Sequence, residues 1–305
     1  MRREGQVAAG TLARGRAAGR SALGWLTLLL RGMAMGIAEL VPGISGGTIA
    51  FVTGIYDELV GTLASFRPSS LGLLRRGGVR QFWVAHNLTF LLVLGLGMVL
   101  AVLAFARVIG YLLDTVPVLV WAFFFGLIAA AAVQIGRGRR LGALLGYGSL
   151  GLVLALLLLQ IGPRQVEAPL WMFFVGGVLA VSAWLLPAVS GSFLLLTLGL
   201  YEPVLRALNA GQWLIPLVLL CGCAVGILAF ARLLHWLMTR VREPMLAGLT
   251  GFMCGSLPRL WPWQNDGLLL PAGYEAVTGQ PALLLPAVAA VAVGSLVLWL
   301  LSRLE

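Results

Sequence analysis

The sequence contains no lysine, two histidines, three cysteines and few charged residues of either sign. Charged residues make up 10% of the 305 residues, whereas soluble domains have about 25%. His86 and His235 lie far apart, and neither has a partner at the spacing of metal ligands, so we expect no metal site and no cofactor. The chain also lacks a phosphate-binding loop, a nucleophile elbow and a zinc-protease motif. These absences argue against ATP hydrolysis and familiar hydrolase chemistry.

What the chain has instead is apolar sequence, at 60% of its residues. The apolar runs are long and continuous, for example 88–106 and 144–159, whereas the strands of a membrane barrel alternate over about 10 residues. We therefore expect an all-α, multi-pass membrane protein. The net charge of +10 comes from arginines in short loops, which are typical of topology determinants facing anionic lipid, and we expect no nucleic-acid partner.

The hydropathy pattern predicts ten apolar elements, with boundaries good to a few residues. They are expected at 22–41, 48–65, 82–112, 117–136, 142–161, 169–186, 192–208, 212–238, 244–258 and 281–302.

One motif, Pro-x-x-Ser-Gly, occurs twice and interrupts an apolar stretch each time, at Pro42–Gly46 and at Pro187–Gly191. The flanking residues match in register, which indicates an internal duplication. We assign residues 1–21 to an arginine-rich cytoplasmic segment, 22–161 to a first repeat and 162–305 to a second. The matching pairs are Gly32 and Gly177, Ala38 and Ala183, Gly54 and Gly199, and Tyr56 and Tyr201.

Segment length shows how each motif is used. As one helix, residues 22–65 would extend about 60 Å, twice the roughly 30 Å of the hydrocarbon core. The chain must therefore fold back at the break, and the same holds for residues 169–208. We expect two helical hairpins, re-entrant or fully crossing, each followed by three transmembrane helices.

The arginines orient this arrangement. The positive-inside rule places the N-terminal arginines, the loop at 67–80, the loop at 137–140, and Arg240, Arg242 and Arg303 on the cytoplasmic side. An odd number of crossings in each half then inserts the second repeat upside down, with both termini in the cytoplasm. Inverted repeats with paired breaks are typical of alternating-access transporters, whose substrates bind at the breaks.

The breaks favour binding of an anion. Pro42 and Pro187 end the incoming helices, and Gly43 lets backbone approach a ligand closely. Serine then caps the outgoing half-helix, whose first N–H groups suit phosphate. The alternative is a tight turn in which serine only satisfies the backbone. The expected phosphate-binding residues are Ser45, Gly46, Gly47 and Thr48 in the first break, and Ser190, Gly191 and Ser192 in the second.

Four charged residues within apolar segments are further candidates. Glu39, whose repeat counterpart is Trp184, either couples movement to protons or forms an ion pair with Arg31. Arg107 and Arg232 occur in matching Phe-Ala-Arg tripeptides and either meet an anionic headgroup or extend to the interface. Since Glu39 breaks the symmetry, we expect the first break to carry any coupling.

The run from Arg31 to Asp57, with Glu39-Leu-Val-Pro-Gly-Ile-Ser-Gly-Gly-Thr48 at its centre, resembles the PopT-type undecaprenyl-phosphate translocase family. The second motif of that family is similar to Leu186–Phe193 and its continuation to Tyr201, and the resemblance covers nearly the whole chain. Glu39 stands where the family commonly has aspartate, and Ala188 stands where it usually has glycine.

This resemblance implies a flippase of the bacterial cytoplasmic membrane. It would return undecaprenyl phosphate, the lipid carrier of peptidoglycan synthesis, from the outer to the inner leaflet. The phosphate would bind between the opposed serine-glycine breaks, with Arg31, Arg107 and Arg232 as further ligands and Glu39 as the proton-coupling group. Without the resemblance, the sequence predicts only an anionic, phosphate-like substrate. We expect no enzyme activity.

Two other functions remain open at this point. A small-anion channel or exchanger would use the same half-helix termini. An intramembrane lipid phosphatase would need a histidine nucleophile near arginines, and His86 and His235 lack the surrounding motif. The sequence specifies no oligomeric state.

Overall fold

The computed structural model describes residues 20–41, 44–67, 70–160, 168–187, 189–265 and 267–303. These parts are almost entirely helical, and their β pairing is limited to one isolated bridge between Gln264 and Leu268. Several residues used in the prediction lie outside the described residues: most of the N-terminal segment, Pro42, Gly43 and Ala188.

The first half of the chain begins with α2 (Ala22–Glu39), α3 (Gly46–Val52) and α4 (Tyr56–Ser65). It continues with α5 (Ser70–Ala85), α6 (Leu88–Thr115) and α7 (Pro117–Gly136), and ends in one stretch, 141–159, made of α8, a π turn and α9 (Ser149–Leu159). The second half contains α10 (Leu170–Leu185), α11 (Gly191–Thr197), α12 (Tyr201–Asn209), α13 (Leu214–Arg240), α14 (Arg242–Ser256), the 3-10 turn Leu257–Leu260, α15 (Pro271–Thr278) and α16 (Leu284–Ser302).

In the described parts, six helical stretches are long and apolar enough to cross a membrane: α2, α6, α7, residues 141–159, α13 and α16. A seventh crossing results if α11 and α12, which meet at a bend of 99°, count as one broken span. This confirms an all-α membrane protein. Helix α14 covers the predicted element 244–258, and its 15 residues before the 3-10 turn make it shorter than these six stretches.

Helices α5 and α15 were not predicted, and each outgoing arm was predicted as one helix instead of two. The loop expected at 67–80 contains most of α5, and the loop before the last helix contains α15. The outgoing arms predicted at 48–65 and 192–208 are each two helices joined at a glycine. Gly54 and Gly199 both have a φ of 72°, a left-handed conformation that glycine adopts without strain, so each arm turns there.

Glycine contacts repeat between the two halves. Gly97 of α6 faces the Leu29 carbonyl of α2, and Gly222 of α13 faces the Phe174 carbonyl of α10. An added Cβ would lie 2.3 and 2.0 Å from these oxygens, so only glycine permits the approach. The helix pairs α2–α6 and α10–α13 therefore pack in the same way, as expected for a duplicated chain.

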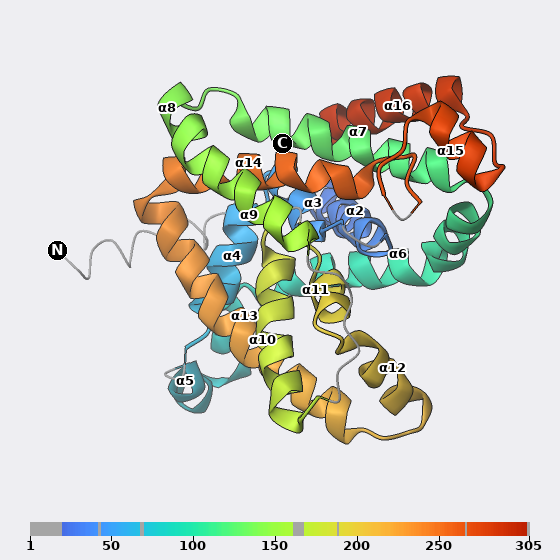
Figure 1. Ribbon diagram of the computed structural model, residues 1–305. Helices are drawn as coiled ribbons and strands as arrows, with labels where there is room; N and C mark the ends of the chain where they lie inside the picture. Colours follow the sequence, from blue (N-terminus) through green and yellow to red (C-terminus); the bar gives the residue numbers. More distant parts are fainter. Residues whose placement is uncertain are drawn as a thin grey trace.

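The third helices of the two halves are exchanged. Gly126 of α7 packs against Val291 of α16, and Gly251 of α14 packs against Gly148, which immediately precedes α9. Helices α7 and α16 lie side by side, and α14 lies along α9 (Figure 1). Each half is thus completed by a helix from the other half.

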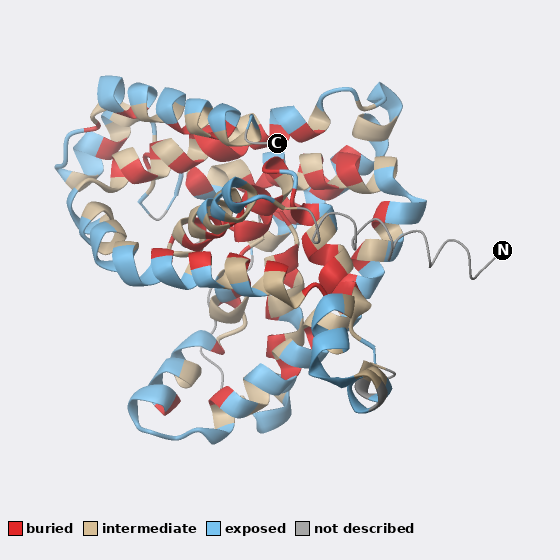
Figure 2. Cartoon of the chain, turned by 180° about the vertical axis from the view of Figure 1, so that it is seen from behind, coloured by how far each residue is buried: buried red, intermediate tan, exposed pale blue. Residues whose placement is uncertain are grey.

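The first hairpin lies at the centre of the molecule and the second extends toward the outside. Nearly every residue of α3 is buried, and Ile49 belongs to the main hydrophobic core. Figure 2 shows this buried centre and the exposed surfaces of the outer helices. On α12 only Ala207 is buried. The two hairpins therefore differ in their surroundings although their motifs match.

Candidate functional site

The first break forms a serine-capped half-helix, as predicted. Ser45 has extended backbone angles, φ −121° and ψ 131°, and its hydroxyl accepts a hydrogen bond of 3.0 Å from the Gly47 N–H. Residues Ser45 to Thr48 are all buried. Serine supports the start of α3 because its side-chain oxygen replaces the missing backbone acceptor.

The first N–H groups of this half-helix already bond to acceptors within the protein. The carboxylate of Glu39 accepts a hydrogen bond of 2.6 Å from the Gly46 N–H. The Gly47 N–H bonds to Ser45 Oγ, and the Thr48 N–H bonds to the Ser45 carbonyl at 3.0 Å. Glu39 thus places an anionic group where a substrate phosphate was expected, at the positive end of α3.

The first hairpin contacts the end of α10, just before the second break. The Ser45 hydroxyl donates to the Trp184 carbonyl at 3.1 Å, and the Tyr56 hydroxyl donates to the Leu185 carbonyl at 2.8 Å. The Trp184 side chain also lies beside the Glu39 carboxylate. The end of α10 is therefore joined to the first hairpin by two hydrogen bonds, and the repeat counterparts Glu39 and Trp184 are neighbours.

The second break is more open. Ser190 caps α11 through a hydrogen bond of 3.3 Å from the Phe193 N–H, and its hydroxyl lies 2.9 Å from that of Ser192. Ser190 is buried, whereas Ser192 is exposed. Within the described residues no acceptor is recorded for the N–H groups of Gly191 and Ser192, which begin the half-helix. Pro187 is buried just beyond the end of α10.

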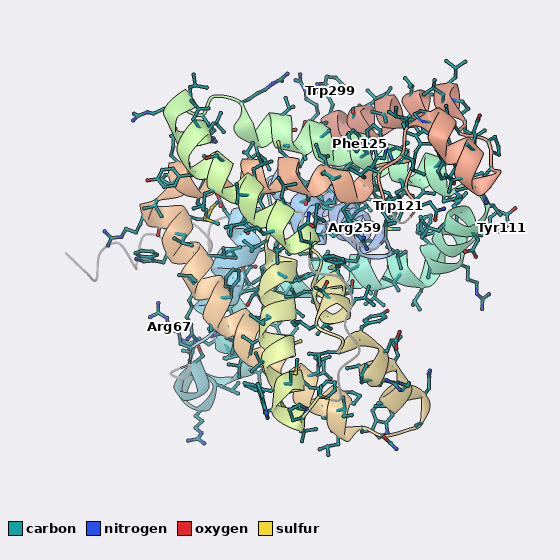
Figure 3. The ribbon with its side chains drawn as sticks, viewed as in Figure 1. Arg67, Tyr111, Trp121, Phe125, Arg259 and Trp299 are labelled. Atoms are coloured by element: carbon teal, nitrogen blue, oxygen red, sulfur yellow. The ribbon has the colours of Figure 1, made fainter. Side chains whose placement is uncertain are left out.

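Arg259 is a residue that sequence reasoning missed. It lies on the 3-10 turn after α14, and its guanidinium is 4.7 Å from the centre of the Phe193 ring, at the start of α11. Figure 3 places Arg259 near the middle of the molecule rather than at its edge. One signal was available, since an arginine on the side predicted to be extracellular departs from the positive-inside pattern.

Arg107 and Arg232 have no recorded contact with the break residues that the structure describes. Arg107 is exposed on α6. Arg232 on α13 donates a hydrogen bond to the Phe66 carbonyl, at the C-terminus of α4. Arg31 is half-buried in α2, eight residues before Glu39. The structure therefore assembles Glu39, Ser45 and Trp184 in one place, with the second break adjoining them through α10.

The histidines are not arranged as a nucleophile or a metal site. His86 is buried, its Nδ1 lies 2.8 Å from Ser65 Oγ, and its ring stacks on Phe66. Burial lowers the pKa of His86, which lies in the turn between α5 and α6. No group of three or more possible metal ligands occurs among the residues that the structure describes.

Comparisons with known proteins identify the family of this chain. Residues 35–270 match the family model described as undecaprenyl phosphate translocase-like. The chain is 37% identical to a polyprenyl-phosphate transporter of Vibrio cholerae over 279 residues, which cover 85% of this chain and 90% of that protein. It is 29% identical to a polyprenyl-phosphate transporter of Staphylococcus aureus over 258 residues, 78% and 86% of the two chains. No solved structure gives a significant match. The chain is therefore a multi-pass membrane protein that belongs to the undecaprenyl phosphate translocase-like family, a family of transporters rather than enzymes.

Proposed function

We propose that this protein is a flippase that returns undecaprenyl phosphate from the outer to the inner leaflet of the bacterial cytoplasmic membrane, where cell-wall synthesis reuses it. The observation that carries the proposal is the family match, because residues 35–270 contain both breaks. Two relatives named polyprenyl-phosphate transporters support the substrate.

The proposed topology has two inverted repeats, 22–161 and 162–305, with both termini in the cytoplasm. Figure 1 supports it, since α8 and the turn between α13 and α14 lie at one end of the molecule and α15 lies at the other. The first end carries Arg137, Arg139, Arg140, Arg240 and Arg242, and positive charge favours the cytoplasmic side.

The phosphate would first bind at the second break. Ser190, Ser192 and the N–H groups at the start of α11 supply hydrogen-bond donors, and Arg259 beside Phe193 supplies positive charge. A lipid with a small charged head needs a polar path only for that head, so its tail remains in the bilayer during transfer.

The first break would then exchange one anion for another. Glu39 accepts from the Gly46 N–H and lies beside the Trp184 side chain, so a phosphate can reach α3 only if the carboxylate leaves. We propose that protonation of Glu39 weakens this hydrogen bond and lets the phosphate take its place. This exchange would couple lipid movement to protons and would separate the two breaks, which Ser45 and Trp184 now join.

Lipid turnover in reconstituted vesicles tests the proposal. Wild-type protein should move a labelled polyprenyl phosphate between leaflets, and Glu39→Gln and Ser45→Ala should each reduce the rate at least tenfold without loss of folded protein. Arg206→Gln, an exposed arginine on α12, is the matched control and should retain the wild-type rate. Unchanged turnover in the Glu39 and Ser45 variants would reject the roles of these two residues.

The same vesicles distinguish the other functions. Flux of chloride or inorganic phosphate without polyprenyl lipid would favour an anion channel. Release of inorganic phosphate from the lipid, abolished by substitution of His86 and His235, would indicate a phosphatase. We expect neither result.

A further inference from the structure

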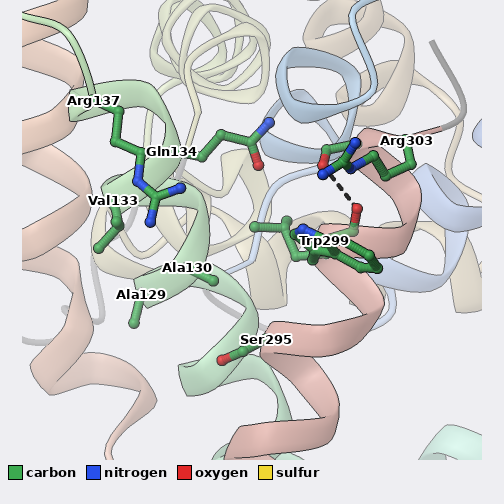
Figure 4. A pocket seen from close by; sticks show the side chains of 10 residues that line it. Ala129, Ala130, Val133, Gln134, Arg137, Ser295, Trp299 and Arg303 are labelled. Atoms are coloured by element: carbon green, nitrogen blue, oxygen red, sulfur yellow. Dashed lines mark hydrogen bonds between the residues drawn. The ribbon is translucent and has the colours of Figure 1, made fainter.

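A pocket of about 590 Å³ lies between the C-terminal ends of α7 and α16, apart from both breaks. Its volume falls within the range of about 300–1,000 Å³ that is typical of ligand sites. Figure 4 shows Arg137 of α7 on one side, Arg303 after α16 on the other, and Gln134 between them. The full lining is Ala129, Ala130, Val133, Gln134, Arg137, Ser295, Leu298, Trp299, Ser302 and Arg303.

The charge of the pocket is positive. Neither Arg137 nor Arg303 takes part in an ion pair with any residue in the described part of the chain. The Arg303 guanidinium lies 4.9 Å from the centre of the Trp299 ring, which holds it at the pocket edge. The hydroxyls of Ser295 and Ser302 donate to backbone carbonyls, so the two guanidinium groups and the Gln134 amide are the donors left for a ligand.

The remaining wall is apolar and open at the outer surface. Leu298 is 1% exposed and belongs to the main hydrophobic core, so it forms an apolar inner wall of the pocket. Val133 and Trp299 are 57% and 51% exposed, and in a membrane their exposed faces contact lipid tails. A charged head with an attached hydrocarbon chain matches this combination better than a free ion does, since basic pockets between helices on the cytoplasmic side bind lipid headgroups.

The position of Gln134 has a counterpart at the second break. Gln134 follows Gly126 by eight residues, and Arg259 follows Gly251 by eight residues, where the two glycines occupy matching contacts in α7 and α14. The position eight residues after the matched glycine therefore carries a donor side chain in both halves, Gln134 in α7 and Arg259 on the turn after α14. In one half it faces the second break, and in the other it faces this pocket.

We propose that the pocket between α7 and α16 binds the phosphate of a lipid headgroup, with Arg137 and Arg303 as its ligands and the lipid chain lying against Val133 and Trp299. The phosphate belongs either to a polyprenyl phosphate or to a bulk anionic phospholipid. This proposal does not depend on transport, because binding is measured directly.

Native mass spectrometry of the purified protein tests it. The protein is incubated separately with undecaprenyl phosphate, with phosphatidylglycerol and with inorganic phosphate. The double variant Arg137→Gln/Arg303→Gln should bind lipid phosphate at least tenfold more weakly than wild type. The control Arg240→Gln removes an exposed arginine at the same end of the molecule, outside the pocket, and should bind like wild type.

The lipid whose binding is weakened in the double variant identifies the source of the phosphate. Loss of undecaprenyl phosphate alone assigns the pocket to the transported lipid, whereas loss of phosphatidylglycerol assigns it to bulk lipid. Equal binding by wild type and the double variant, or binding of inorganic phosphate alone, would overturn the proposal. Photocrosslinking of a lipid phosphate to the wild-type protein needs no variant and should label residues 129–137 or 295–303. Labelling confined to other segments would also overturn it.

Discussion

The two Pro-x-x-Ser-Gly breaks share a motif, but they differ in burial and in the hydrogen bonds of their backbone N–H groups. The first is buried and closed, because Glu39 and Ser45 satisfy its backbone N–H groups. The second has an exposed serine, Ser192, and an arginine, Arg259, beside its half-helix. The residue three positions before each proline differs between the breaks, and these two residues, Glu39 and Trp184, are neighbours. The matched position thus carries a carboxylate that bonds to the first half-helix in one repeat and an indole in the other.

The largest expected effect concerns the glycine that follows each serine. A Cβ on Gly191 would lie 2.5 Å from the Ala180 carbonyl, which is fixed in α10, whereas a Cβ on Gly46 would lie 2.9 Å from the movable end of Glu39. We expect Gly191→Ala to destabilise the fold by about 1–3 kcal/mol through overpacking, and Gly46→Ala to cost less. Apparent melting temperatures in detergent measure both. Equal losses would mean that the two breaks are packed alike.

The second prediction tests whether the open break binds substrate. Arg259→Gln removes the positive charge beside Phe193, so we expect the half-saturating concentration of polyprenyl phosphate to rise about tenfold, since bonds to charged groups contribute about 1.5–3 kcal/mol. Transport rates at several lipid concentrations give this value. The Arg206→Gln protein is the control. An unchanged half-saturation would remove Arg259 from the site.

A smaller difference is expected between the matched arginines. Arg232 holds the Phe66 carbonyl at the end of α4, whereas Arg107 has no recorded hydrogen bond or ion pair in the described residues. We therefore expect Arg232→Gln to lower the apparent melting temperature by about 2–4 °C and Arg107→Gln to leave it unchanged. The same fall in both variants would show that their structural roles are equivalent.

The smallest effect is a pH dependence of stability where the turn between α5 and α6 packs against the end of α4. Burial keeps the folded-state pKa of His86 below its usual value of 6.5, so the folded state favours neutral histidine. Its contribution to stability is complete above pH 6.5 and is lost as the pH falls toward the lowered pKa. Between pH 7.5 and 5.5 the wild type should lose more thermal stability than His86→Phe, whose ring can still stack on Phe66. Parallel losses would exclude His86 as the cause.

Much of the fold could be predicted because hydrophobicity and arginine placement are strong signals in membrane proteins. The ends of α7 and the caps at Ser45 and Ser190 match the prediction closely. Helix α5 was missed because its residues are polar and arginine-rich, as in a loop, and it bends at Gly78. The turns at Gly54 and Gly199 were visible as a repeated pair, but a glycine alone does not show whether a helix ends there.

The site was less predictable because its contacts cross the repeats. Hydropathy placed Glu39 in the membrane but gave no sign that its carboxylate would bond to Gly46, seven residues later, and lie beside Trp184 of the other half. Arg259 follows the predicted element 244–258 and was assigned to a loop. Its contact with Phe193 was missed because the two residues are 66 positions apart in the sequence. Long-range partners of this kind depend on how helices pack, which local patterns do not encode.

The exchange of third helices has a consequence for biosynthesis. The glycine face of α7 is covered by α16, and Leu284, which begins α16, follows Gly136 by 148 residues. At about 5–20 residues per second, the ribosome needs roughly 7–30 s to make that intervening chain. During this time α7 waits in the bilayer without its partner. The first half therefore cannot complete its packing as an independent unit before α16 has been inserted.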